Sequence, residues 1–163
     1  MTAHSIYGAQ AMELKLSNLQ NGPVTIVDDD FLVPDGFSLT THPRGYAVLR
    51  KYLSPSRAKK IYLHRFITGA TMGQFVDHIN RNKLDNRRVN LRFSSIIENA
   101  RNRPCKSACF ITKSQNWRAS VRENYKRIIL GHFSTEREAI ECSNQHKLAN
   151  WGEFAVIWPL EVL

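Results

Sequence analysis

An aspartate and a histidine stand side by side at Asp77 and His78, at the start of a segment rich in asparagine and arginine. Hydrolysis of a phosphodiester bond needs a base that activates water, a positive charge on the phosphate and help for the leaving oxygen. An imidazole with an ordinary pKa of about 6.5 suits the base, and a carboxylate can hold a hard cation such as Mg²⁺. The pair therefore predicts hydrolytic chemistry; the alternative is a structural histidine next to a turn acid.

Short elements are expected to position this pair. Residues 75–79 are typical of a strand, residues 80–88 of a polar loop and residues 89–93 of a second strand. Ser95 with Glu98 is a capping-box pattern that predicts a helix, which Pro104 ends. Because neighbouring strand residues face opposite sides, Asp77 is expected to hold an ion while His78 takes a proton from water. Asn99, on the helix, is expected to bring its amide oxygen to the same ion.

The segments before the pair give weaker signals. Residues 59–70 favour a short amphipathic helix ended by Gly69, although so short an apolar run is also compatible with a strand. The first 50 residues are typical of short strands and turns. Asp28, Asp29 and Asp30 follow one of these strands and indicate a turn more than a metal site.

Positive charge is concentrated in the middle of the chain. Residues 1–49 carry two basic and five acidic side chains, residues 50–106 carry fourteen and three, and residues 107–163 carry seven and six. A second basic cluster follows the middle segment: Lys113, Arg118, Arg122, Lys126 and Arg127. Such a distribution indicates a polyanionic partner. A basic face kept only for solubility is the alternative, but solubility calls for mixed signs.

The last third of the chain predicts a three-stranded sheet with one helix. Residues 116–124 and 125–133 form two strand-like runs joined by a tight turn near Glu123 and Asn124, and residues 108–113 are a candidate third strand. Ser134 or Thr135 is the expected N-cap of the helix, with Glu138 as its returning acid and Gly152 past its end. Residues 139, 142, 146 and 149 are expected to face the core.

Cysteine usage and hydropathy indicate an intracellular protein. Three cysteines give no disulfide framework, and the spacing of Cys105, Cys109, Cys142 and His146 resembles a zinc site only loosely. The first dozen residues lack the pattern of a signal peptide, and the densest apolar run is too short to span a membrane. We therefore expect no membrane partner and a cytoplasmic location, in a bacterium or a phage-infected host cell.

The ordered string LHRFITGA…VDHINRNKLDNRRVNLRFSSIIENARNR, between Leu63 and Arg103, resembles the HNH endonucleases, specifically the homing type of phages and introns. That family has an Asp-His pair, a polar loop, an Asn-Leu-Arg on the second strand and a helix with a final Asn or His. The resemblance implies the ββα-metal (His-Me finger) fold and metal-dependent cleavage of DNA.

By position, the resemblance implies that Asp77 and Asn99 hold the metal, His78 is the general base and Asn90 braces the loop. Asn102 is the alternative to Asn99, because the spacing to the helix varies. His64 is expected to be structural and Arg65 to meet DNA. The remaining arginines are expected to contact phosphates flanking the cut: Arg81, Arg87, Arg88, Arg92, Arg101 and Arg103.

The segment from about Ser107 to Ala155 resembles the AP-two DNA-binding domain of plant ethylene-response factors. The matching residues are Trp117, Arg118, Ala119, Leu130, Gly131, Phe133, Thr135, Glu138, Ala139, Gly152 and Ala155. That family lays its sheet in the major groove and reads bases with Arg and Trp side chains. Cys142 and Ser143 depart from its pattern, so base specificity stays open. The residues implied to contact DNA are Lys113, Trp117, Arg118, Arg122 and Arg127.

These signals together predict an α+β protein of three modules: β-rich at 1–50, HNH nuclease at 51–106 and AP-two-like at 107–163. The expected function is that of an endonuclease that uses Mg²⁺ or Mn²⁺, and no small-molecule cofactor, to cleave double-stranded DNA. Nicking is the expected product, by a monomer or a homodimer. The alternative is a sequence-specific DNA-binding protein with an inactive nuclease module. The joint presence of the four site residues favours activity. RNA is a weaker candidate substrate, because the basic segment mostly lacks aromatic stacking platforms.

Overall fold

The structure is a computed structural model that describes residues 10–16 and 22–160. It divides the chain into two compact units, Met1–Phe93 and Ser94–Leu163. The described elements are helices and short strands in several small sheets, so the predicted α+β class is confirmed. The three predicted modules and the ββα-metal fold of the middle one stay predictions.

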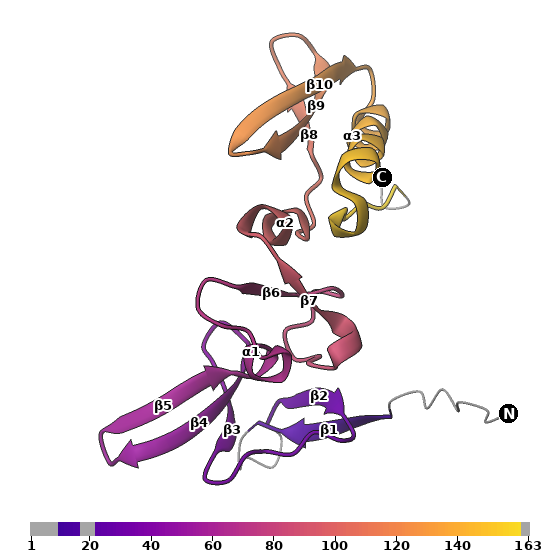
Figure 1. Cartoon of the computed structure of the whole chain (residues 1–163). Helices are drawn as coiled ribbons and strands as arrows, with labels where there is room; N and C mark the ends of the chain where they lie inside the picture. Colours follow the sequence, from indigo (N-terminus) through magenta and orange to yellow (C-terminus); the bar gives the residue numbers. More distant parts are fainter. Residues whose placement is uncertain (1–9, 17–21, 161–163) are drawn as a thin grey trace, which may run out of the picture. The chain divides into compact units, whose positions relative to one another are not determined.

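Two small sheets open the first unit. Strands β1 (Ala11–Lys15) and β2 (Val24–Asp28) pair antiparallel. Strands β3 (Ser38–Thr41), β4 (Ala47–Ser54) and β5 (Arg57–Tyr62) form an antiparallel sheet with β4 in the middle (Figure 1). The predicted strands and turns are thus present, and β4 continues past residue 50.

An apolar core joins these sheets to helix α1 (Leu63–Thr68). Burying one such side chain contributes about 1.5–3 kcal/mol, so a few of them can hold a small unit together. The core therefore fixes α1, and with it the start of the segment that leads to Asp77 and His78. Its buried members are Leu16, Val27, Phe31, Ala47, Leu49 and Leu63.

The helix predicted over residues 59–70 is shorter than expected. Residues 59–62 belong to β5, where Tyr62 pairs with Val48, and the helix begins at Leu63. The strand is favoured there because pairing with β4 satisfies backbone groups, and a short apolar run has no period that excludes it. The predicted helix end is confirmed, since Gly69 has a φ of 65°, which glycine adopts at little steric cost.

Strand β6 (Phe75–His78) pairs with β7 (Leu91–Ser94), and the predicted polar loop connects them. The second strand starts later than expected, because residues Arg88–Asn90 form the 3₁₀ turn η1. In this turn the Asn90 N–H donates to the Arg87 carbonyl at 2.9 Å. The loop therefore ends in an ordered turn that fixes the direction of the Asn90 side chain.

The second unit begins with helix α2 (Ile96–Arg101), which carries the predicted capping box. The Glu98 N–H donates to Ser95 Oγ at 3.1 Å, and the Ser95 N–H donates to the Glu98 carboxylate at 2.7 Å. Helix α3 (Glu136–Trp151) begins in the same way, with Thr135 as the N-cap. Thr135 rather than Ser134 is thus the cap residue. Each cap satisfies backbone donors and contributes about 1 kcal/mol.

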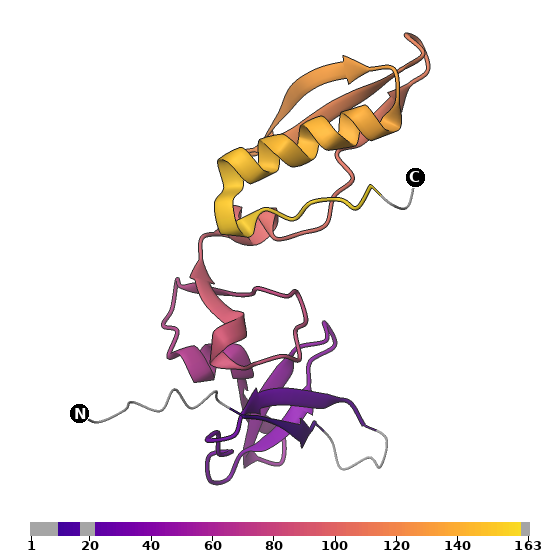
Figure 2. The ribbon, with the colours of Figure 1, turned by 90° about the vertical axis from the view of Figure 1, so that its right-hand side faces the viewer.

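The predicted three-stranded sheet with one helix is present in the second unit. Strands β8 (Ala108–Ile111), β9 (Asn116–Glu123) and β10 (Lys126–Phe133) pair antiparallel with β9 in the centre, and α3 packs on one face (Figure 2). The turn between β9 and β10 consists of Asn124 and Tyr125, one residue later than predicted.

The buried face of α3 differs from the predicted one. Ala139 is buried, but Ala149 is exposed, and the fully buried positions further along the helix include Ser143 and Lys147. The hydrophobic period missed Lys147, which is 1% exposed and donates from Nζ to the Cys105 carbonyl at 2.7 Å. Burial lowers the pKa of this lysine. No helix in the described residues is long and apolar enough to cross a membrane.

Candidate active site

His78 ends β6 and is 4% exposed. Its Nε2 lies 3.3 Å from Asn86 Oδ1, and its ring packs against those of His64 and Tyr46, with centroids 5.1 and 6.1 Å away. Because an amide oxygen only accepts, this hydrogen bond requires the proton on Nε2, which leaves Nδ1 as the basic nitrogen. Burial lowers the pKa of His78, and the hydrogen bond to Asn86 partly opposes that shift.

Asn86 is a positioning residue that the sequence reasoning missed. It is completely buried, and its amide nitrogen donates to Thr25 Oγ1 at 2.8 Å. Its backbone N–H also donates to the Ile26 carbonyl at 2.7 Å, which ties the loop to β2. An asparagine in a polar loop is usually a turn former, so only its pairing with a buried histidine distinguishes it. Asn86 therefore connects the orientation of His78 to the fold of the first unit.

His64 lies behind His78 and fits the structural role expected of it. The residue is buried in α1, and its ring contacts Tyr46, Tyr62 and His78 at 5.1–5.6 Å between centroids. Burial is the main reason that its pKa falls to about 4, and the neighbouring His78 adds to the effect. His64 is therefore neutral near pH 7 and packs as an aromatic ring.

Asp77 precedes His78 in the sequence and is also buried, but its side chain has different partners. Arg92, on β7, donates to Asp77 Oδ2 from Nε at 3.3 Å and from Nη2 at 3.1 Å. The side chains of this ion pair are only 8% and 10% exposed, so the interaction is little screened by solvent. The separate partners of Asp77 and His78 agree with the alternation expected of a strand. Arg92, predicted to contact DNA phosphates, here balances the candidate metal ligand.

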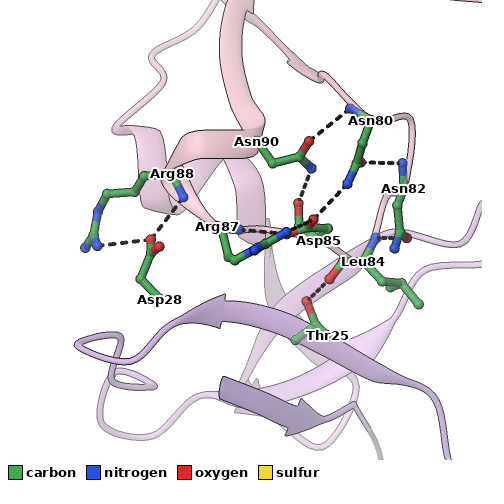
Figure 3. Close-up of polar contacts among 9 residues, drawn as sticks. All are labelled: Thr25, Asp28, Asn80, Asn82, Leu84, Asp85, Arg87, Arg88 and Asn90. Atoms are coloured by element: carbon green, nitrogen blue, oxygen red, sulfur yellow. Dashed lines mark hydrogen bonds and ion pairs between the residues drawn. The ribbon is translucent and has the colours of Figure 1, made fainter. Parts of the chain in front are cut away.

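The loop between β6 and β7 is held by side chains rather than by regular structure (Figure 3). Asn90 Oδ1 accepts from the Asn80 N–H at 2.9 Å, and Asn90 Nδ2 donates to the Asp85 carbonyl at 2.7 Å. Arg87 pairs with both carboxylate oxygens of Asp85 at 2.8 and 2.7 Å, and this pairing lowers the pKa of Asp85. Asn90 thus joins the two ends of the loop, the geometry that the resemblance implies for it.

Several arginines predicted to contact DNA have partners inside the first unit. Arg65 donates to the carbonyls of Gln74 and Thr71 at 2.5 and 2.7 Å. Arg88 bridges Asp28 and Asp30, at the end of β2 (Figure 3 shows Asp28). These aspartates therefore form a turn with an arginine partner. Arg81 differs from the others: it is exposed, with a φ of 65°, and its side chain has no polar partner among the described residues.

Asn99 and Asn102 lie on and after α2, in the second unit. Asn99 is half-buried within the helix, and Asn102 is the buried residue at its C-cap. The choice between them as a metal ligand therefore stays a prediction. Arg101 and Arg103 belong to the same unit, and Arg103 is exposed.

The sheet of the second unit places its predicted DNA contacts on two faces. Trp117 shares a face with the buried Ala119 and Val121, toward α3, because alternate residues of β9 point the same way. Its ring packs on Phe110 at 5.3 Å between centroids. The open face carries Arg118 and Arg122 on β9 together with Arg127, which pairs with Arg122 in the register. Lys113 is exposed in the turn before β9.

The donor chemistry at Asp77 fits a hard divalent cation. Mg²⁺ binds through one or two carboxylates together with waters and substrate oxygens, so it needs no complete protein cage. The carboxylate of Asp77 is buried and pairs with the positive charge of Arg92. Among the described residues no three His, Cys, Asp or Glu side chains form a group that could enclose a metal. Cys105 and Cys109 are exposed, and His146 hydrogen-bonds Glu123.

Comparison with known proteins identifies similarity in the same region of the chain. Residues 62–101 match the family model described as HNH endonuclease. An uncharacterized HNH endonuclease of Acanthamoeba polyphaga mimivirus is 33% identical over 105 residues, which cover 59% of this chain and 56% of the mimivirus protein. The chain thus spans little more than half the length of that relative. No solved structure matches. Residues 62–101 are therefore similar to the HNH endonucleases, a family of phosphodiester hydrolases.

Proposed function

We propose that this protein is a metal-dependent endonuclease of the HNH homing type that nicks double-stranded DNA. The single observation that supports the proposal best is the buried His78, whose Nε2 is bound by Asn86 and which follows Asp77 in β6. A neutral histidine with one nitrogen fixed and the other basic is the arrangement that a general base needs.

The residues of the chain divide the work. His78 takes a proton from water through Nδ1, while Asn86 holds the ring and the Asn90–Asp85 contact holds the loop behind it. Asp77 and Asn99 are the residues that would hold Mg²⁺ or Mn²⁺, with Asn102 as the alternative to Asn99. When bound, the metal supplies a positive charge for the phosphate and the leaving oxygen. A positioned base contributes about 10²–10⁴-fold to such a reaction.

DNA is the substrate that the charge pattern favours. The open face of the β8–β9–β10 sheet carries Arg118, Arg122 and Arg127, which can neutralise phosphates or donate to the edge of guanine in a major groove. Trp117 lies on the opposite face and is assigned to the packing of the sheet. With one candidate base among the residues that the structure describes, a nick is the natural product of a monomer.

One observation favours the rival function, a DNA-binding protein with an inactive nuclease domain. Arg92 occupies two hydrogen-bonding directions of the Asp77 carboxylate. If Asp77 served only to neutralise Arg92, the pair would be part of the folded framework and no metal would bind there. The two functions predict different results with divalent metals.

Cleavage of a supercoiled plasmid separates them. The protein is incubated with plasmid in Mg²⁺, in Mn²⁺ and in EDTA, and nicked and linear products are resolved on a gel. The proposed function predicts nicked circles with either metal and intact plasmid in EDTA. Retention of the plasmid in a protein complex without cleavage in any metal would support the rival.

A further inference from the structure

The second unit contains a groove between α2 and the β8–β9–β10 sheet, with a volume of about 630 Å³. We call it the α2–sheet groove. Pockets of about 300–1,000 Å³ hold ligands of the size of a nucleotide. The sequence assigned Arg101 and Arg103 to the nuclease and Arg122 and Arg127 to a separate DNA-reading sheet. All four line this one groove.

The groove is strongly positive. None of its lining residues is an aspartate or a glutamate. Glu123 lies just outside the lining, where it accepts from Trp151 Nε1 at 3.0 Å and interacts electrostatically with Arg101. The Nε of Arg101 is also buried without a hydrogen-bond partner among the described residues. The positive charge of the lining favours an anionic ligand.

Apolar and aromatic side chains form the rest of the lining. Ile97, Ala100 and Val121 contribute aliphatic surface, and Trp151 lies at the end of α3, with the guanidinium of Arg101 5.5 Å from its ring centroid. A phosphate backbone alone would need no such surface. A nucleobase does, since every base has a flat face that stacks on aromatic rings or on arginine.

Tyr125 lines the groove from the turn between β9 and β10, where its backbone conformation is unfavourable for tyrosine. Asn124 and Tyr125 both have positive φ, 47° and 66°, as a type I′ hairpin turn requires. Glycine is the favoured second residue of such a turn, and tyrosine is strained there. The side chain is nevertheless 79% exposed, so packing within the unit does not explain it. Its ring is available to a ligand in the groove.

We propose that the α2–sheet groove binds an unpaired segment of a DNA strand. A base of this segment packs against the apolar surface and Tyr125, and the flanking phosphates contact the four arginines. The proposal rests on the proposed function in taking DNA as the substrate, and it assigns Arg122 and Arg127 to an unpaired segment rather than to a duplex major groove. Duplex DNA keeps its bases stacked inside and offers mainly phosphates and groove edges, so it would leave the apolar surface unused. An unpaired segment uses both parts of the lining.

The test compares two variants of neighbouring residues with one variant of the turn. Binding of a labelled single-stranded oligonucleotide of about 10 nucleotides, and of a duplex with the same sequence, is measured by fluorescence anisotropy in EDTA, where a metal-dependent enzyme cannot cut. Arg127→Gln removes a charge from the groove. Lys126→Gln removes one from the adjacent residue of β10, which does not line the groove.

We expect the full-length protein to bind the single strand, Arg127→Gln to weaken that binding about fivefold to tenfold with a smaller salt dependence, and Lys126→Gln to change it less than twofold. Tyr125→Gly creates the preferred Asn-Gly turn, so it should keep or raise the melting temperature while it weakens single-strand binding about tenfold. A melting temperature that is kept or raised while binding weakens distinguishes a lost ligand contact from a damaged fold.

Equal weakening of single-strand binding by Lys126→Gln and Arg127→Gln, or unchanged single-strand binding in Tyr125→Gly, would contradict the proposal that the groove binds an unpaired strand. So would binding of the duplex alone. These outcomes are distinct from failure of the proposed function, which plasmid cleavage reports: a protein that nicks DNA but fails the groove test remains a nuclease, and a protein that binds the strand but never cuts retains the groove.

Discussion

Arg92 donates from Nε and Nη2 to Oδ2 of Asp77, at 3.3 and 3.1 Å, with both side chains about nine-tenths buried. The relationship connects the stability of the β6–β7 pair to the candidate active site. Removal of one partner from a buried ion pair leaves the other charge uncompensated, which costs more than the net contribution of the pair.

We therefore expect Asp77→Asn to lower the free energy of unfolding by about 2–4 kcal/mol, and Arg92→Met to do so by a similar amount. The double variant should be less destabilised than the sum of the two single ones, because it leaves neither charge unpaired. Urea denaturation of the four proteins measures this. Additive losses of unfolding free energy would contradict an energetic coupling between Asp77 and Arg92.

Asn86 should act on the reaction through His78. Asn86→Ala removes the acceptor of the Nε2 proton, so kcat for plasmid nicking should fall about 10-fold to 100-fold, with a smaller change in KM. Asn82→Ala is the matched control, since Asn82 is an exposed asparagine of the same loop that accepts from the Leu84 N–H. Equal effects of the two substitutions would show that loop stability alone is responsible.

Acid should destabilise the first unit through His64. The unfolded chain protonates this histidine near pH 6.5, but the folded one does so only near pH 4. The unfolded state thus binds more protons between these values, and stability must fall as the pH drops through this window, by roughly 3 kcal/mol in total. His64→Phe keeps a ring in the cluster and should remove this part of the slope in urea titrations from pH 7 to pH 4. An unchanged slope would contradict the assignment.

The arginines of the first unit should separate into two classes. Arg81→Gln should lower DNA affinity and its salt dependence with little change in melting temperature, since the side chain is exposed and has no polar partner among the described residues. Arg87→Gln should instead lower the melting temperature, because it breaks two hydrogen bonds to the 2%-exposed Asp85. Thermal melts and salt-dependent binding of duplex DNA check both, and the reverse pattern would contradict the division.

The sequence predicted the elements better than the contacts of their side chains. The capping boxes at Ser95 and Thr135, the end of α1 at Gly69 and the strand that carries Asp77 and His78 follow from local rules. The partners of Asn86, Arg92 and Lys147 depend on contacts with residues distant in sequence, so no local pattern reveals them. Trp117 shows the same limit, because the face it occupies depends on which side of the sheet α3 covers.

The roles of the site side chains were predicted from the order of residues in the motif. The structure provides contacts relevant to these roles for some of the residues and not for others. Asn90 has a bracing geometry, and His78 has a partner that the motif does not name. Asn99 and Asn102 lie in the other compact unit, so the second metal ligand is still assigned from the resemblance.

The most direct test of the central claim is the single-turnover rate of plasmid nicking in Mg²⁺ by the wild-type protein and by His78→Ala, with DNA binding measured in parallel. The account predicts that His78→Ala nicks at least about 100-fold more slowly and binds DNA as the wild type does. Nicking at the wild-type rate by a folded His78→Ala protein would contradict His78 as the general base.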